Sequence, residues 1–416
     1  MRLTQTHKFF DSLLLFLLVF SGGGLLFVFN RKICTISLFC IALFVIIFMG
    51  KRIKLSVFNS SLFSLIFLFS VIIINYLTSI GNQEVIKYYF HLLNISSCVL
   101  ISTHFLNNRD KSYFLNRIRF ILKVVLFYSI FNFLFYIIVK NSLTQIIYNS
   151  DKTMYTFSQI FFYNPEKSSF HLFGIELVRN QGWFWEPGIN QIYLNIFLYL
   201  EGFVFKKNKW IILLIVLTIF TTYSTTGMII MLIILFFIFK SSIKRNPILV
   251  LLVIGIMIPF YFITKTNIEE KLDTSSFQKR YFDLIQTLSI AKDYPLTGIG
   301  LDVDYFSEFR SSYNMDDEFR RSIELSTSFE SKTKSTEKGS SNSVTYLMAA
   351  MGFPISFFLL YCMFKQTLFT HKKGILMMII FISVFSEPLL LRPFFLIFII
   401  SGMIEFFSKF TKLKLK

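Results

Sequence analysis

The chain has 416 residues, of which 54% are hydrophobic and 16% charged, and its mean hydropathy is +0.61. A soluble domain of this length could not cover so much apolar surface, so the composition indicates a polytopic membrane protein. The formal net charge of +18 does not indicate a nucleic-acid-binding protein. The basic residues lie in short clusters between apolar runs, which is the positive-inside pattern.

Apolar runs long enough to cross about 30 Å of hydrocarbon recur along the chain. The expected spans lie near Phe9–Phe29, Ile33–Met49, Leu55–Leu77, Val85–Leu106, Ile118–Val139, Gly188–Phe205, Trp210–Phe239, Pro247–Thr264, Asn342–Phe364, Gly374–Leu391 and Pro393–Ser408. The first run begins like a signal peptide but continues through Phe29, which favours an uncleaved span.

The run Trp210–Phe239 is too long for one upright helix and short for two. Its centre, Thr221–Gly227, is polar and weak in helix propensity, which predicts two short spans joined there. The whole chain, residues 1–416, is then one all-α integral membrane domain with about twelve transmembrane helices.

This count puts the basic clusters on one side, so both termini and Lys240–Asn246 are expected in the cytoplasm. Two large polar loops, residues 140–187 and 265–341, are then expected in the periplasm. Within the second loop, Lys271–Ile290 has the spacing of an amphipathic helix that lies on the membrane or caps the bundle. The low-complexity piece Ser322–Ser341 is expected to be mobile.

The stretch Arg179–Gly188 ends the first polar loop and opens an apolar span. Trp183 and Trp185 are residues that favour the membrane–water interface. Pro187 suits the first turn of a helix. Arg179 and Glu186 are thereby held at the mouth of a membrane helix, where charges are costly unless they are paired or used.

Four motifs in this order resemble the integral-membrane O-antigen polymerase and ligase superfamily. They are Arg179-x-x-Gly182-x-Phe184-x-Glu186-Pro187-Gly188; Ser224-Thr225-Thr226-Gly227; Arg280 followed by Pro295-Leu296-Thr297-Gly298-Ile299-Gly300; and Ser341-Asn342-Ser343 leading to Ala350-Met351-Gly352-Phe353-Pro354. Ser341 stands where the ligase branch usually has a His, which favours the polymerase branch. The resemblance implies a bacterial inner-membrane protein whose active face is periplasmic.

The resemblance also implies a donor saccharide carried on undecaprenyl diphosphate. Departure of a lipid diphosphate leaves negative charge on an oxygen, so cations are needed there, and Arg binds two phosphate oxygens at once. Arg179 and Arg280 are therefore expected to converge on one diphosphate, with Glu186 as base for the acceptor hydroxyl. The alternatives are that each Arg anchors its loop to lipid headgroups, and that Glu186 complements the helix dipole and pairs with Arg179.

Five further residues are candidate substrate contacts, each with a structural alternative. Asn342 binds sugar or caps its helix. Trp183 and Trp185 stack on sugar or anchor the interface. Glu387 and Arg392, on either side of Pro388, line the site or form a structural ion pair.

The favoured function is a polymerase that transfers a lipid-linked glycan chain onto an incoming lipid-linked repeat unit. A ligase that moves finished glycan to lipid A-core is the close alternative, and a flippase is the distant one. A flippase is expected to bury cations along its spans, whereas here they lie at the span ends and in the two loops. Membrane lipid and a protein that regulates chain length are expected partners; no metal, cofactor or nucleotide is indicated.

Overall fold

The computed structural model describes residues 5–50, 52–108, 111–149, 152–172, 175–206, 208–245, 275–313 and 339–413. The chain forms two compact units. Unit 1 comprises Met1–Met49, Arg109–Pro259 and Phe369–Ser383, and unit 2 comprises Gly50–Asn108, Phe260–Leu368 and Val384–Lys416.

Unit 1 is built around helix α8, Pro187–Tyr199, whose residues from Ile189 onward are all buried. Such a helix, covered on every side, belongs to the core of a bundle. It packs against α6, α9 and α10, and α1 packs against α3 and α6. The other helices of this unit are α1 Gln5–Phe20, α2 Leu25–Phe29, α3 Arg31–Phe48, α6 Lys111–Val139, α9 Lys209–Thr221, α10 Thr225–Arg245 and most of α16, Lys373–Ser386.

A π-helical segment, Leu200–Phe205, extends α8. Within it, Glu201 is fully buried and accepts two hydrogen bonds from Arg119 of α6, at 2.5 and 3.0 Å. A bidentate pair of this kind is among the stronger ionic contacts in proteins, and it fixes the end of α8 against α6.

The first expected polar loop contains two small antiparallel sheets, so the all-α expectation is wrong for this part of the chain. Their strands are β1 Thr144–Asn149, β2 Lys152–Phe157, β3 Phe161–Tyr163, β4 Ser169–Leu172 and β5 Ile175–Val178, with the short helix α7, Pro165–Ser168, between β3 and β4. These segments are rich in β-branched and aromatic residues, which suit a half-buried sheet surface.

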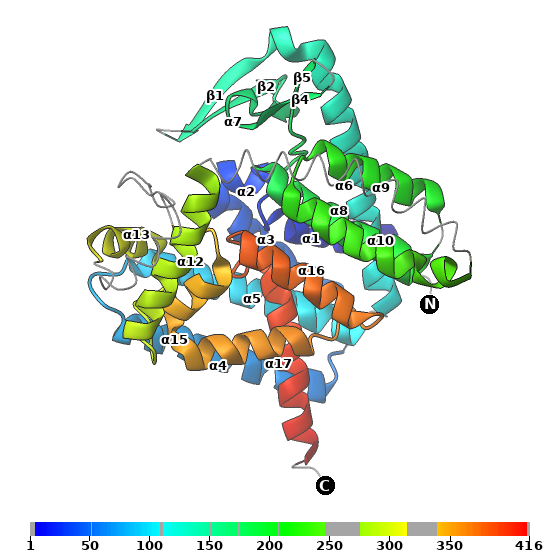
Figure 1. Cartoon of the computed structure of the whole chain (residues 1–416). Coiled ribbons are helices and arrows are strands. Elements are labelled where there is room, and N and C mark those ends of the chain that lie inside the picture. Colours follow the sequence, from blue (N-terminus) through cyan, green and yellow to red (C-terminus); the bar gives the residue numbers. More distant parts are fainter. Residues whose placement is uncertain are drawn as a thin grey trace. The chain divides into compact units, whose positions relative to one another are not determined.

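The sheets lie beside the C-terminal end of α6 (Figure 1). The Tyr163 hydroxyl donates to the carbonyl of Asn132 at 3.0 Å, and the Tyr128 hydroxyl donates to the carbonyl of Ile160 at 2.6 Å. Tyr136 and Val139 of α6 form one buried cluster with Tyr163 and with Val178 of β5. These contacts fix the end of β5 against α6, and the segment that leads to α8 begins there.

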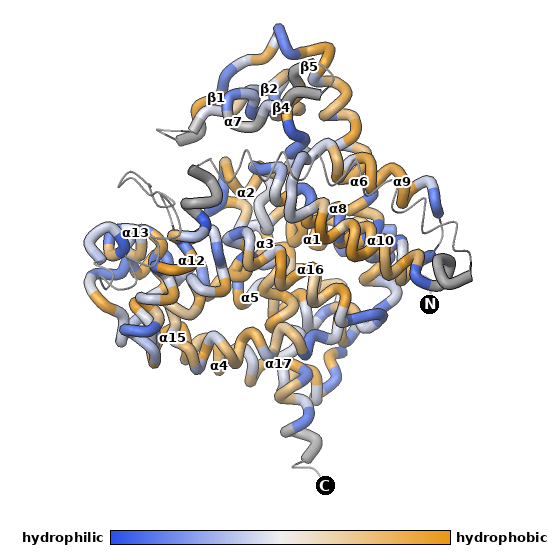
Figure 2. The backbone as a smooth tube through the Cα atoms, in the orientation of Figure 1, coloured by the Kyte–Doolittle hydropathy of each residue, from blue (hydrophilic) through white to orange (hydrophobic). Residues whose placement is uncertain are grey.

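Unit 2 is built around α17, Pro393–Leu413, whose residues 393–404 are all buried. This helix packs against α4, α5 and α15, and α12 packs against α15. Hydrophobic residues dominate α4, α15 and α17 (Figure 2). The bounds of the other helices are α4 Leu55–Thr78, α5 Val85–Asn108, α12 Ser275–Asp293, α13 Val303–Ser312 and α15 Ser343–Lys365.

Among the described residues, five helices are long and apolar enough to cross a membrane: Arg31–Phe48, Leu55–Thr78, Val85–Asn107, Lys111–Ser142 and Ser343–Lys365. The protein is therefore a predominantly helical membrane protein. The total of about twelve spans stays a prediction, and the span expected at Pro247–Thr264 lies outside the described residues.

Two expected spans differ from the helices observed. The run Phe9–Phe29 is broken, because α1 ends at Phe20 and α2 begins at Leu25. Three consecutive glycines, Gly22–Gly24, are weak helix formers and lie in this break. Helix α16 ends at Ser386 rather than Leu391, since the residue before Pro388 disfavours helical backbone.

The expected break in Trp210–Phe239 is confirmed, because α9 ends at Thr221 and α10 begins at Thr225. The helix expected at Lys271–Ile290 is also confirmed over its described part. It packs against α15, which favours the role of a cap on the bundle. Of Ser322–Ser341, only the last three residues are described.

Candidate functional site

The loop Arg179–Glu186 connects β5 to α8 and contacts the break between α1 and α2. The Leu25 amide donates to the carbonyl of Trp183 at 2.9 Å, and the Trp185 amide donates to the carbonyl of Gly23 at 3.2 Å. Between these two bonds, the Phe184 ring is fully buried and stacks on Phe20 and Tyr193. The loop is therefore held by backbone pairing on both sides of one buried ring.

The same loop contacts the break between α9 and α10. The Asn180 amide donates to the carbonyl of Thr221 at 2.9 Å, and Arg179 Nε donates to the carbonyl of Thr222 at 3.0 Å. The Asn180 side chain donates to the Ser129 carbonyl and the Thr221 hydroxyl. A helix break frees backbone carbonyls, and here the loop satisfies them. The structure thus places the first sequence motif against the helix break that directly precedes the second.

The backbone conformation and the close packing at position 182 require a glycine. Its φ is +55°, and a Cβ on this residue would lie 2.6 Å from Ser129 Oγ and 3.0 Å from Asn190 Oδ1. Any other residue would have to move both neighbours and adopt a left-handed backbone. The glycine therefore allows the loop to lie directly on α6 and α8.

Glu186 precedes α8 as its N-cap residue, and its side chain is exposed and makes no capping hydrogen bond. Arg179, its expected partner, donates from Nε to the carbonyl of Thr222. The carboxylate is therefore open to solvent at a helix N-terminus, where negative charge is favoured.

The two Trp side chains are both half-buried. Trp183 stacks on Tyr128 with ring centroids 3.9 Å apart, so one face of its indole is used for packing. This contact fixes Trp183 against α6, and both sugar stacking and interface anchoring stay predictions.

In unit 2, Arg280 of α12 forms an ion pair with Glu387, at 3.2 Å between Nη2 and Oε1. The Arg280 side chain is 45% exposed and that of Glu387 is 7% exposed. Glu387 thus has a cation from α12. The structural ion pair of Glu387 with Arg392 stays a prediction. Arg392 directly precedes α17, and its carbonyl accepts from the amides of Phe395 and Leu396.

Asn342 is the N-cap of α15. Its side-chain oxygen accepts from the amides of Val344 at 3.0 Å and Thr345 at 3.1 Å, and the residue is 3% exposed. Asn342 therefore caps α15, while its contact with sugar stays a prediction. Next to it, the Ser343 hydroxyl donates to the carbonyl of Glu387 at 2.9 Å. Glu387 is thus the common neighbour of Arg280, through its carboxylate, and of the start of α15, through its backbone.

The Pro295–Gly300 segment contacts α15 where that helix is broken at Gly352. The amides of Ile299 and Gly300 donate to the carbonyls of Ala349 and Ala350, at 2.9 and 3.1 Å. The Phe353 amide donates to the Pro295 carbonyl at 2.8 Å. The third and fourth sequence motifs are therefore one interlocked structure that supports α15.

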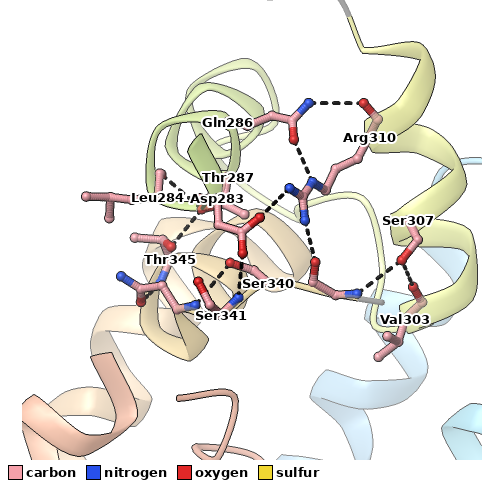
Figure 3. A network of polar contacts seen from close by, with 12 residues as sticks. Asp283, Leu284, Gln286, Thr287, Val303, Ser307, Arg310, Ser340, Ser341 and Thr345 are labelled. Atoms are coloured by element: carbon pink, nitrogen blue, oxygen red, sulfur yellow. Dashed lines mark hydrogen bonds and ion pairs between the residues drawn. The ribbon is translucent and has the colours of Figure 1, made fainter. Parts of the chain in front are cut away.

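Two buried charged residues of unit 2 were not predicted as part of a site. Arg310 of α13 and Asp283 of α12 form an ion pair at 2.5 Å (Figure 3). The signal in the sequence was Asp302, whose side chain caps α13 and marks 303–312 as a helix. That signal identifies the helix but not the partner of Arg310.

Of the described residues, no three His, Cys, Asp or Glu lie close enough to hold a metal ion. The predicted site residues fall in two sets: Arg179, Trp183, Trp185 and Glu186 in unit 1, and Arg280, Asn342, Glu387 and Arg392 in unit 2. The convergence of Arg179 with Arg280 stays a prediction.

Residues 210–360 match a family model described as O-antigen ligase. The match covers α9, α10, α12, α13 and the broken helix α15 up to Leu360, and so includes Arg280 and Asn342. No curated protein matches the chain. This segment of the chain is thus similar to the O-antigen ligase family, and the match does not distinguish the ligase branch from the polymerase branch.

Proposed function

We propose that the protein is a glycosyltransferase that polymerises oligosaccharide repeat units carried on undecaprenyl diphosphate. The reaction takes place at the periplasmic face of the bacterial inner membrane. The growing chain leaves its lipid carrier and is joined to the sugar of an incoming lipid-linked unit.

The observation that carries this proposal is Arg280. It lies inside the matched segment, on a helix that packs against α15, and its side chain is 45% exposed while its partner Glu387 is buried. A partly exposed guanidinium that is anchored at one end suits a diphosphate, because its planar fork binds two oxygens and stays charged.

The chemistry assigns separate roles to the two kinds of charge. The acceptor hydroxyl oxygen bonds to the anomeric carbon of the donor, and the bond from that carbon to the diphosphate oxygen breaks. Arg179 and Arg280 stabilise the charge on the departing diphosphate. The exposed carboxylate of Glu186 accepts the hydroxyl proton.

A ligase that transfers finished glycan to lipid A-core is the second candidate. The description of the matching family model, O-antigen ligase, favours it. The Ser341 residue, in the place where the ligase branch usually has a His, favours the polymerase.

The glycan profile of a deletion strain distinguishes the two. A polymerase deletion leaves a single repeat unit on lipid A-core, because capping of the core proceeds without elongation. A ligase deletion accumulates polymer on undecaprenyl diphosphate and leaves the core bare. An unchanged glycan profile would contradict both functions.

A further inference from the structure

The Asp283–Arg310 pair is fully enclosed in unit 2. The two side chains are 0% and 2% exposed, and Arg310 Nη2 lies 2.5 Å from Asp283 Oδ1. Arg310 Nε also donates to Gln286 Oε1 at 2.5 Å, and its Nη1 donates to the carbonyl of Gly339. The guanidinium therefore connects α12 and α13 to the residues that precede α15 (Figure 3).

Asp283 reaches the same residues from the other side. Its second oxygen, Oδ2, accepts from the amide of Ser341 at 3.0 Å. Gly339–Ser341, which we name the entry strip, is thus held at its first residue by Arg310 and at its last by Asp283. Ser307 of α13 adds a third contact, since its hydroxyl accepts from the Gly339 amide at 3.1 Å.

The entry strip leads directly into residues of the candidate site. Asn342 follows it as the cap of α15, and Ser343 donates to the carbonyl of Glu387. On α12, Asp283 lies one turn after Arg280, which is the cation that pairs with Glu387. The Asp283–Arg310 pair therefore links α12, which carries Arg280, to the first turn of α15, where Ser343 hydrogen-bonds to Glu387.

Stability alone does not explain two buried charges here. The cost of removing both ions from water often exceeds their attraction, and well-packed apolar residues of similar volume are commonly as stable. Apolar side chains cannot, however, hydrogen-bond the carbonyl of Gly339 or the amide of Ser341. These two backbone contacts are what the ion pair supplies.

We propose that the Asp283–Arg310 pair is a positioning device for glycosyl transfer. It holds the entry strip and the first turn of α15 against α12, so that Arg280 and Glu387 keep a fixed relation during the reaction. This inference rests on the proposed function. Both residues act through Arg280 and are positioning residues.

The test compares Arg310→Met, Asp283→Leu and the double variant with the unaltered protein. Each single variant leaves a buried charge without its partner and is expected to unfold at a lower temperature. The double variant removes both charges and is expected to regain most of the unfolding temperature. The assay supplies lipid-linked repeat units, isolated from the deletion strain, to the protein in nanodiscs. In this assay the turnover of the double variant should nevertheless stay about 10²-fold below that of the unaltered protein, as for misplaced catalytic groups.

Two readouts separate positioning from simple structural support. The loss in the double variant should lie in kcat with KM little changed, since Arg280 still binds donor but is no longer fixed. Amide hydrogen exchange should accelerate at Gly339–Ser341 while the buried part of α17 stays protected. Recovery of turnover together with stability in the double variant would overturn the proposal, as would slow exchange at the entry strip.

Failure of the proposed function gives a different result. In that case the unaltered protein does not elongate the lipid-linked units, and Arg280→Ala changes nothing in the glycan profile. If only the positioning role is wrong, the unaltered protein and the double variant are both active, and Arg280→Ala is inactive.

Discussion

Arg280 is partly exposed, whereas its partner Glu387 is buried. Its guanidinium can therefore serve the candidate site both before and after donor binds. Glu387 is 7% exposed, and a buried carboxylate without a cation is costly. Arg280 meets that need while 45% of its side chain stays in contact with solvent. We expect it to hold Glu387 before donor binds and to contact the diphosphate afterwards.

Replacement of either arginine by Ala is expected to abolish long glycan while the single-unit product persists. Loss of one charge-stabilising donor costs about 10²–10³-fold in rate. Arg280→Lys and Arg179→Lys should recover only part of this, since an ammonium lacks the planar fork. Glycan ladders, with protein quantified in the membrane, measure the effect. Full-length chains from both normally expressed Ala variants would remove the two arginines from the site.

Glu186→Gln separates a chemical role from a structural one. The side chain is exposed and makes no capping hydrogen bond, so its neutral isostere should change the free energy of unfolding by less than about 0.5 kcal/mol. If the carboxylate is the base, turnover should fall by about 10²–10⁴-fold. Turnover by the purified Gln variant equal to that of the unaltered protein would leave Glu186 with no chemical role.

Asn342 is expected to matter through the helix that it caps. Asn342→Ala removes two hydrogen bonds at a buried N-cap and should lower the free energy of unfolding by about 1 kcal/mol. Asn342→Ser retains a capping oxygen and should restore both stability and glycan length. A Ser variant that is stable but makes no polymer would instead indicate contact with sugar.

At the scale of elements, the broken helix α15 is the feature on which unit 2 depends. Gly352 has φ +75° and ψ 168°, a conformation that is essentially confined to glycine. A Cβ there would lie 2.3 Å from the carbonyl oxygen of Leu296. The break leaves the carbonyls of Ala349 and Ala350 free for Ile299 and Gly300.

Gly352→Ala is therefore expected to destabilise the protein by more than about 2 kcal/mol, from backbone strain together with the clash. Gly374→Ala is the matched control, because no atom lies within 4 Å of its added Cβ and the residue is in α16. That variant should be neutral or gain up to about 1 kcal/mol in helix propensity. Thermal unfolding in detergent compares the two, and equal effects would contradict this account of the break.

Local composition predicts where helices break but not which residues contact the break. The polar run Thr221–Gly227 indicates a break, and the structure has one. Its partner Asn180 is 41 residues away, and no local pattern reveals that contact. The small sheets were also missed, although β-branched and aromatic residues in 144–157 were a signal for strands. Arg310 and Asp283 belong to a polar stretch whose pairing only the packing of α12 with α13 determines.

At the scale of the whole molecule, the match and the candidate residues overlap only in part. Residues 210–360 include Arg280 and Asn342 but neither Arg179, Glu186 nor Glu387. The periplasmic location of the candidate residues in unit 1 and in unit 2 is thus a separate prediction. It depends on how often the chain crosses the membrane.

The decisive segment for this topology is the pair α9 and α10. Helix α9 has 13 residues. At 1.5 Å per residue it is about 20 Å long, well short of a hydrocarbon core of about 30 Å. The basic residues Lys240, Lys244 and Arg245 at the end of α10 nevertheless favour a cytoplasmic location there. If α9 and α10 together cross only once, that end would instead be periplasmic.

Cysteine labelling resolves the two topologies in a background where Cys34, Cys40, Cys98 and Cys362 are replaced. Cys40 is exposed and Cys34 partly so, and their replacement leaves the introduced cysteine as the labelling site. We expect Ile147→Cys, on an exposed position of β1, to react with a membrane-impermeant maleimide from the periplasm. Ser242→Cys should react only after the membrane is permeabilised, because basic residues flank it. Labelling of position 242 in intact cells would mean that α9 and α10 cross as one span, and both polar loops could then not share the periplasmic face.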